Sequence, residues 1–183
     1  MKKTALALLF AILSVSAFSQ KGDLSVGVKG GYVLSTAYLP FNSILYGADV
    51  AYHLSDQFEV AFTGLLNPNI TRKDQNDKLA VYSANLDLRL YLVHFQNLAT
   101  GPFLGGQYYI VNNSTNSVYN SKALGLNIGW HLRINLTDNL KLNGGWRWVN
   151  AKSKDRNHWW DSSTNDISNH LFYLGLSYTF ESK

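Results

Sequence analysis

The sequence predicts an all-β fold, and three observations support this prediction. Apolar and polar residues alternate along most of the 183-residue chain, which is the period of a strand with two unlike faces. No long segment carries apolar residues at the i, i+3, i+4 and i+7 spacing of an amphipathic helix. The segments between the alternating runs are rich in Asn and Asp, which tolerate the backbone angles of tight turns.

The alternating runs number eight, so we expect eight strands. In order along the chain they are 24–34, 44–54, 58–66, 79–92, 100–111, 123–135, 140–150 and 171–180. The even-numbered positions of these runs are mainly apolar, and none of them is charged. In the same order, the apolar row consists of Leu24, Val26, Val28, Tyr32 and Leu34; Ile44, Tyr46, Val50, Tyr52 and Leu54; Phe58, Val60, Phe62 and Leu66; Tyr82, Leu86, Leu88 and Leu90; Leu104, Tyr108 and Ile110; Leu124, Leu126, Ile128, Trp130, Leu132 and Ile134; Leu140, Leu142, Trp146 and Trp148; and Phe172, Leu174, Leu176, Tyr178 and Phe180.

The odd-numbered positions form a different row. Nine of the fourteen glycines lie there, together with Ser, Ala and amide side chains. Ionisable residues of both signs also lie there: Lys29, Asp49, Glu59, Asp87, Arg89, His131, Arg133, Lys141 and Arg147. Small side chains suit the narrow interior of an eight-stranded barrel, and opposite charges can pair inside it. We therefore expect the polar row to face inward and the apolar row to face a membrane, with aromatic residues near the strand ends at its interfaces.

The connections between the predicted strands alternate in length. The long ones span 35–43, 67–78, 112–122 and 151–170. The shorter ones are Ser55–Gln57, Val93–Ala99 and Leu136–Asn139. Outer-membrane barrels place short turns in the periplasm and long loops outside. This alternation predicts that both chain termini lie on the periplasmic side.

The first nineteen residues have the pattern of a secretory signal peptide. Lys2 and Lys3 form a positive start, Ala5–Val15 an apolar core, and Ala17 and Ser19 the small residues of a cleavage site. We expect residues 1–19 to be removed and residues 20–183 to form one barrel domain. The chain has no cysteine, which excludes a lipoprotein anchor, disulfides, thiolate metal sites and a cysteine nucleophile. We expect no cofactor and no metal.

Nucleic-acid binding has little support in the sequence. The formal net charge is only +4, and two of the positive charges belong to the predicted signal peptide. The chain has neither a phosphate-binding glycine loop nor a dinucleotide-binding glycine pattern. We therefore expect no nucleic-acid partner.

The last predicted strand carries the most specific local motif. Residues 173–180 read YLGLSYTF, with Gly175 followed by Tyr178 and the final aromatic Phe180. This segment is similar to the terminal-strand signal that the barrel-assembly machinery reads, although Glu181, Ser182 and Lys183 follow it. With this segment and its alternating strands, the chain resembles the small eight-stranded outer-membrane barrels of the OmpA/OmpX type, a porin-like family.

The resemblance implies an antiparallel up-and-down transmembrane β-barrel in the outer membrane of a Gram-negative bacterium. Its expected partners are outer-membrane lipids, lipopolysaccharide and, during biogenesis, the barrel-assembly machinery. The inward ionisable residues allow two interpretations, a narrow ion path or a salt-bridged plug. We favour the plug, because eight strands leave no aqueous channel once side chains fill the interior.

The longest predicted loop is a candidate contact surface. Lys152, Lys154 and Arg156 would attract anionic headgroups, and Trp159 and Trp160 would add apolar contact. Ordinary contact with the membrane leaflet, lipopolysaccharide binding and adhesion to an unknown extracellular partner all fit this composition.

Two further interpretations stay open at this point. His158, Asp161 and Ser162 in the same loop allow a lipid A-modifying enzyme, although a triad confined to one loop lacks a rigid frame. A soluble secreted barrel that binds a small apolar ligand would also alternate in this way. We expect a non-enzymatic barrel with a structural or surface-interaction role.

Overall fold

The computed structural model describes residues 22–35, 43–71, 78–113, 121–153 and 168–181. These residues form one antiparallel sheet of nine strands: β1 (Leu24–Ser35), β2 (Ser43–His53), β3 (Phe58–Thr71), β4 (Lys78–Leu90), β5 (Val93–Phe95), β6 (Leu98–Asn113), β7 (Ser121–Asn135), β8 (Leu140–Ser153) and β9 (Asn169–Phe180). Among the described residues, no helix is long and apolar enough to cross a membrane.

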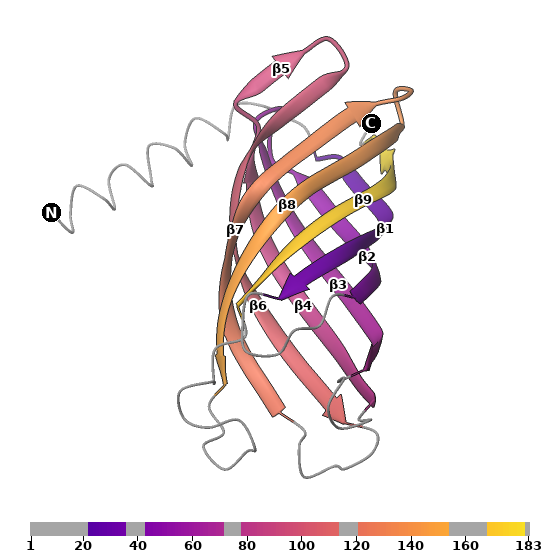
Figure 1. Cartoon of the computed structure of the whole chain (residues 1–183). Helices are drawn as coiled ribbons and strands as arrows, with labels where there is room; N and C mark the ends of the chain where they lie inside the picture. The colour runs from indigo at the N-terminus through magenta and orange to yellow at the C-terminus, as the bar shows by residue number, and fades with distance from the viewer. Residues whose placement is uncertain (1–21, 36–42, 72–77, 114–120, 154–167, 182–183) are drawn as a thin grey trace, which may run out of the picture.

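The sheet closes into a barrel of eight long strands (Figure 1). Sequential strands pair as neighbours except β4 and β5, because β4 pairs directly with β6, and β1 pairs with β9. The predicted eight-stranded up-and-down barrel is therefore confirmed. Closure satisfies the edge hydrogen bonds of the long strands, which an open sheet would leave exposed.

The strand that follows β4 differs from the prediction. The run predicted as 79–92 ends at Leu90, and the predicted turn Val93–Ala99 contains β5, which pairs only with the start of β6. The chain reverses at Gln96, whose φ of 46° lies in the left-handed region. Three residues of alternation are too short to register as a strand in the sequence pattern.

The third strand is longer than predicted. The predicted end at Leu66 fell just before Pro68, yet β3 continues to Thr71. Its register with β4 shifts between Asn67 and Ile70, where the strand has one extra residue. A bulge of this kind accommodates a proline, because it lifts the residue without an N–H out of the hydrogen-bonded ladder.

The two predicted faces are present. Even-numbered apolar side chains are exposed on the outer wall, whereas the odd-numbered polar ones are buried inside it. Lys122 departs from this pattern: β7 begins at Ser121, two residues earlier than predicted, and places this exposed lysine on the outer face. Lys122 lies at the strand end, where a long aliphatic stem can carry its charge beyond an apolar band.

Inward-facing glycines create the space for the polar interior. A Cβ added at Gly105 would lie 2.3 Å from Oδ1 of Asp87, and one added at Gly129 would lie 2.6 Å from the Phe103 ring. The outward-facing Gly64 and Gly106 have no neighbouring atom within 4 Å of such a Cβ. The inward glycines are therefore required by packing, and these two outward ones are not.

Candidate functional site in the barrel interior

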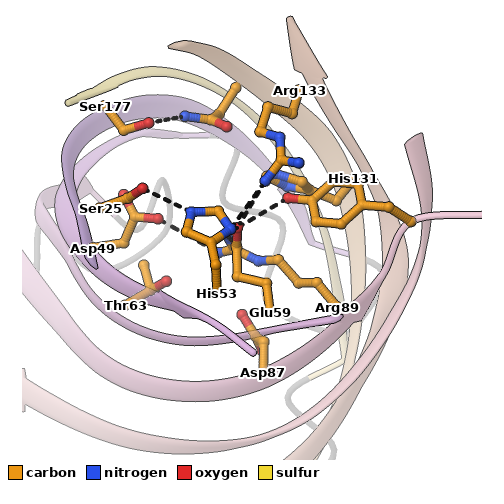
Figure 2. Close-up of polar contacts among 12 residues, drawn as sticks. Ser25, Asp49, His53, Glu59, Thr63, Asp87, Arg89, His131, Arg133 and Ser177 are labelled. Carbon is orange, nitrogen blue, oxygen red and sulfur yellow. Dashed lines mark hydrogen bonds and ion pairs between the residues drawn. The ribbon is translucent and has the colours of Figure 1, made fainter. Parts of the chain in front are cut away.

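Glu59 is the centre of a cluster near the short-turn end of the barrel. Its Oε1 accepts a hydrogen bond from Nη1 of Arg89 at 2.5 Å, and the two residues are register partners on β3 and β4. Nη1 of Arg133, on β7 across the interior, lies 3.3 Å from Oε2 (Figure 2). The Tyr91 hydroxyl donates to the same oxygen at 3.2 Å. Three donors thus surround one buried carboxylate.

Tyr91 supports this cluster in two further ways. The Arg133 guanidinium lies over its ring, 4.1 Å from the centroid, which is a cation–π geometry. Tyr91 is just beyond the end of β4, and burial together with the Glu59 carboxylate raises the pKa of its phenol above the ordinary value. The phenol therefore keeps its proton and remains a donor to Glu59.

Asp49 links the Glu59 cluster to the middle of the barrel. Its Oδ2 lies 3.1 Å from Nζ of Lys29 on the adjacent strand β1 and 3.5 Å from Nη2 of Arg89. Lys29 also contacts the Thr63 hydroxyl at 3.5 Å and the Tyr173 ring. Arg89 therefore bridges the carboxylates Asp49 and Glu59.

Asp87 and Arg147 form an ion pair that crosses the barrel. Nη2 of Arg147 on β8 donates to Oδ2 of Asp87 on β4, and β6 and β7 separate these strands in the sheet. Arg147 and Asp87 are only 2% and 1% exposed. An open aqueous lumen at this height would solvate both side chains.

The remaining predicted interior residues are His131, Arg133 and Lys141. His131 lies beside Tyr173, with Nδ1 2.9 Å from the phenol oxygen, whereas Arg133 contacts Glu59 and His53. Lys141 is half-buried on β8, opposite Asn135 and Ser177. His131 and Arg133 have different polar partners, although both lie against the Tyr91 ring.

The predicted loop residues fall largely outside the described part of the chain. Lys152 belongs to β8 and pairs in register with Leu124. The other loop candidates, and the three residues of the possible loop triad, lie beyond the described residues: Lys154, Arg156, Trp159, Trp160, His158, Asp161 and Ser162.

The predicted assembly-signal residues lie on β9. Gly175 faces Lys29 of β1 so closely that an added Cβ would lie 2.4 Å from the Val28 carbonyl oxygen. Tyr178 and Phe180 are exposed on the outer face, and their rings meet edge to face at 5.0 Å. This final strand closes the barrel against β1.

Sequence reasoning missed two tyrosines that organise the interior. Tyr91 and Tyr173 occupy odd-numbered positions and are buried among the charged side chains. The sequence contains a signal for them, because each is a large aromatic residue in a row that otherwise holds mostly Gly, Ser and amide side chains. Such a residue in a narrow lumen needs a partner for its hydroxyl, and Glu59 and His131 provide those partners.

Ser25, His53 and Glu59 are arranged in the order of a hydrolytic triad. Oγ of Ser25 lies 2.8 Å from Nε2 of His53, and Nδ1 of His53 lies 3.3 Å from Oε2 of Glu59 (Figure 2). A base of this kind must accept the serine proton at Nε2 and carry its own proton on Nδ1. The three residues could therefore act as a triad only if Nδ1 of His53 carries the proton and Nε2 does not.

The surroundings of the three residues favour the opposite proton arrangement. Nη1 of Arg133 lies 3.2 Å from Nδ1 of His53, and a guanidinium can only donate. If Nδ1 accepts that bond, Nε2 carries the proton and donates to Ser25. The Ser25 hydroxyl also contacts Thr179 at 2.7 Å, and both Ser25 and His53 are 5% exposed. This arrangement joins β1, β2 and β9 by hydrogen bonds.

No group of three or more metal-ligating His, Cys, Asp or Glu side chains occurs in the described residues.

Ser25 is expected to resist a fluorophosphonate probe, because its hydroxyl is buried and accepts a hydrogen bond from His53 instead of donating one to it. Folded barrel and the Ser25→Ala variant should show the same background labelling by mass spectrometry. Stoichiometric modification of Ser25 in folded protein would contradict the assigned hydrogen-bond direction.

Replacement of Asp87 by Ala should lower the free energy of unfolding by about 3–5 kcal/mol, because it leaves Arg147 buried without its carboxylate. Urea titration of the refolded barrel measures the change. The double replacement of Asp87 and Arg147 by Leu should recover part of the loss, and Asp138→Ala, in an exposed turn, should have little effect. Equal losses in Asp87→Ala and Asp138→Ala would refute a stabilising role for the pair.

Comparisons with known proteins agree with this architecture. The sequence profile described as "Outer membrane protein beta-barrel domain" matches residues 5–180. Solved structures with a similar fold include neisserial surface protein A (TM-score 0.65, 14% identity, covering 87% of this chain and 99% of that one). OprG of Pseudomonas aeruginosa is another (TM-score 0.59, 13% identity, covering 90% of this chain and 98% of that one).

A third similar structure is the attachment invasion locus protein Ail of Yersinia pestis, in complex with the heparin analogue sucrose octasulfate. Its TM-score is 0.54 at 13% identity, and the match covers 89% of this chain and 100% of that one. No curated protein sequence matches the chain. These structures share its fold, and the sequence profile covers nearly its whole length. The chain therefore belongs to the outer membrane protein β-barrel family, whose members are bacterial outer-membrane barrels.

Proposed function

We propose that this protein is a non-enzymatic outer-membrane barrel whose closed interior supports a structural or surface-interaction role. The burial of the crossing pair Arg147–Asp87 carries the proposal, because both side chains are shielded from water in mid-barrel. Glu59, Asp49 and their cationic partners fill the interior between this pair and the short-turn end. The arrangement favours a plug over an ion path.

The lengths of the connections support the orientation that we propose. The turn between β2 and β3 and the turn between β7 and β8 are short, and both chain ends of the barrel lie at the same end as these turns (Figure 1). Short turns on the periplasmic side are the rule in bacterial outer-membrane barrels. In our proposal residues 1–19 direct export and are removed, and the barrel-assembly machinery reads β9.

The long connections would then face the exterior and present the contact surface. The end of β8 and the connection that follows it, residues 152–163, read KSKDRNHWWDSS and combine Lys152, Lys154 and Arg156 with two tryptophans. Basic residues attract anionic glycans and headgroups, and tryptophan adds apolar area at an interface. Ail, a barrel of the same fold, was solved with a polysulfated sugar, which is compatible with an anionic partner here.

An enzymatic role has weaker support. The inner Ser25, His53 and Glu59 are buried, and the guanidinium of Arg133 competes for the histidine nitrogen that a triad needs to be protonated. Hydrolysis also needs a site where a substrate carbonyl reaches both the nucleophile and oxyanion donors, and the burial of Ser25 disfavours such access.

Planar-bilayer recordings test the closed interior. Purified barrel should add no steady conductance, because charged side chains occupy the lumen and an eight-stranded barrel has room only for side chains. A sixteen-stranded porin, which contains an aqueous channel, serves as the positive control in the same bilayer. A reproducible porin-like current from the purified protein would overturn the proposal of a plug.

Surface interaction is tested by deletion of residues 152–166. The deletion should reduce the attachment of expressing cells to anionic glycan surfaces. The difference in attachment between the intact protein and the deletion variant should become smaller at high salt, because screening weakens binding by the intact protein. Replacement of Lys152, Lys154 and Arg156 by Gln is the matched variant that keeps loop length. Unchanged attachment in both variants, with normal surface expression, would exclude this loop as the contact element.

A further inference from the structure

Two apolar grooves lie on the lipid-facing wall, and Tyr46 contributes to both. The first has a volume of about 310 Å³ and lies over β2, β3, β4 and β6, with Gly64 and Ala84 as its floor. The second has a volume of about 580 Å³ and lies over β8, β9, β1 and β2, with Gly30 in its floor. Tyr46 therefore stands between two neighbouring depressions of the outer surface.

The strand register explains the first groove. Tyr46, Leu66, Tyr82 and Ile110 are neighbours in one row across four strands, and they form a wall of large side chains. In the next row Gly64 pairs with Ala84, which pairs with Tyr108, so small residues lie between large ones. With strands about 4.8 Å apart, the groove runs for roughly 14 Å around the barrel.

The position of the grooves indicates which lipid they meet. The outer wall contacts the hydrocarbon of the outer membrane, so an occupant of these apolar depressions is an acyl chain. Tyr46 lies three residues after the start of β2, near the end of the barrel that carries the long connections. The second groove extends from Tyr46 to Leu142, which is two residues after the start of β8 at the short-turn end. In the proposed orientation the Tyr46 end of both grooves lies in the outer leaflet, whose lipid is lipopolysaccharide.

A positive charge extends the same row. Ile110 pairs in register with Lys122 of β7, and Lys122 is the exposed charged residue on the outer face described above. It lies beside the end of the first groove, at the membrane interface, where a lysine binds anionic headgroups. Lipid A combines several acyl chains with phosphate groups, which matches two grooves and an adjacent cation.

We propose that these grooves bind the acyl chains of one lipopolysaccharide molecule, on either side of Tyr46, and that Lys122 binds a phosphate of its lipid A. The inference rests on the proposed orientation of the barrel in the membrane. It assigns a defined lipid site to the outer wall, separate from the loop at residues 152–163.

Filling one groove at a time tests the proposal, and glycine positions allow this without steric conflict. Gly64→Leu fills the first groove, because nothing lies within 4 Å of a Cβ at that site. Gly30→Leu fills the second, where the nearest atom, the Leu45 carbonyl oxygen, is 3.8 Å away. Gly106→Leu is the matched control, because Gly106 also faces outward with open space but lines neither groove. Ala84→Leu replaces Gly64→Leu if the latter fails to refold.

Native mass spectrometry of the refolded barrel mixed with lipid A measures the fraction of protein that retains one lipid. Each filled-groove variant should retain roughly tenfold less lipid A than wild type, whereas Gly106→Leu should be unchanged. Lys122→Gln should reduce binding of lipid A by roughly fivefold and leave binding of dephosphorylated lipid A unaffected. Equal retention by the filled-groove variants and the control, or equal retention of phosphatidylethanolamine and lipid A by wild type, would overturn the proposal.

Fractionation of cells separates this inference from the proposed function. Wild-type protein that is folded in the outer membrane and yet retains no lipid A would overturn the lipid site alone. Protein absent from the outer-membrane fraction would overturn the proposed function and, with it, the orientation on which the lipid site depends.

Discussion

Pairing of buried charges is the constraint on which the rest of this barrel depends. Asp49, Glu59 and Asp87 are each buried inside the barrel, and an isolated carboxylate there would cost several kcal/mol. Each therefore has a cationic partner at contact distance, and Arg133 and Arg147 reach theirs across the interior. These cross-lumen pairs set the separation of opposite walls and fix the strand register, because a slip of one residue would turn a charge toward the lipid.

The same constraint explains where glycine occurs. The inward Gly105 and Gly129 leave the space that Asp87 and Phe103 fill, so small and long side chains alternate around the lumen. On the outer wall Gly64 and Gly30 have no such neighbour, and they leave shallow grooves instead. Glycine therefore has two roles in one sheet, and the parity of its position distinguishes them.

Much of this architecture could be predicted from the sequence, because alternation is a local property that each strand displays by itself. The inward side of Glu59 and Arg89 follows from parity alone, and their pairing follows from adjacency of the third and fourth strands. The partners of Arg147 and Arg133 could not be predicted in this way, because they depend on barrel curvature and on which side chains span the lumen. Tyr91 was missed because the chain leaves the regular strand at that residue, and the continuation of β3 was missed because a bulge accommodates Pro68.

The short strand β5 has a consequence for the way this sheet ends. Every long strand has at least two hydrogen-bonded neighbours, whereas β5 pairs only with β6, so its other side is a free backbone edge of the described sheet. Free edges invite strand addition from other chains, and natural proteins limit this hazard by keeping edge strands very short. With three residues before the reversal at Gln96, β5 offers too few backbone groups for an incoming strand to pair with stably. The brevity of β5 thus protects the short-turn end of the barrel from the aggregation that closure prevents elsewhere.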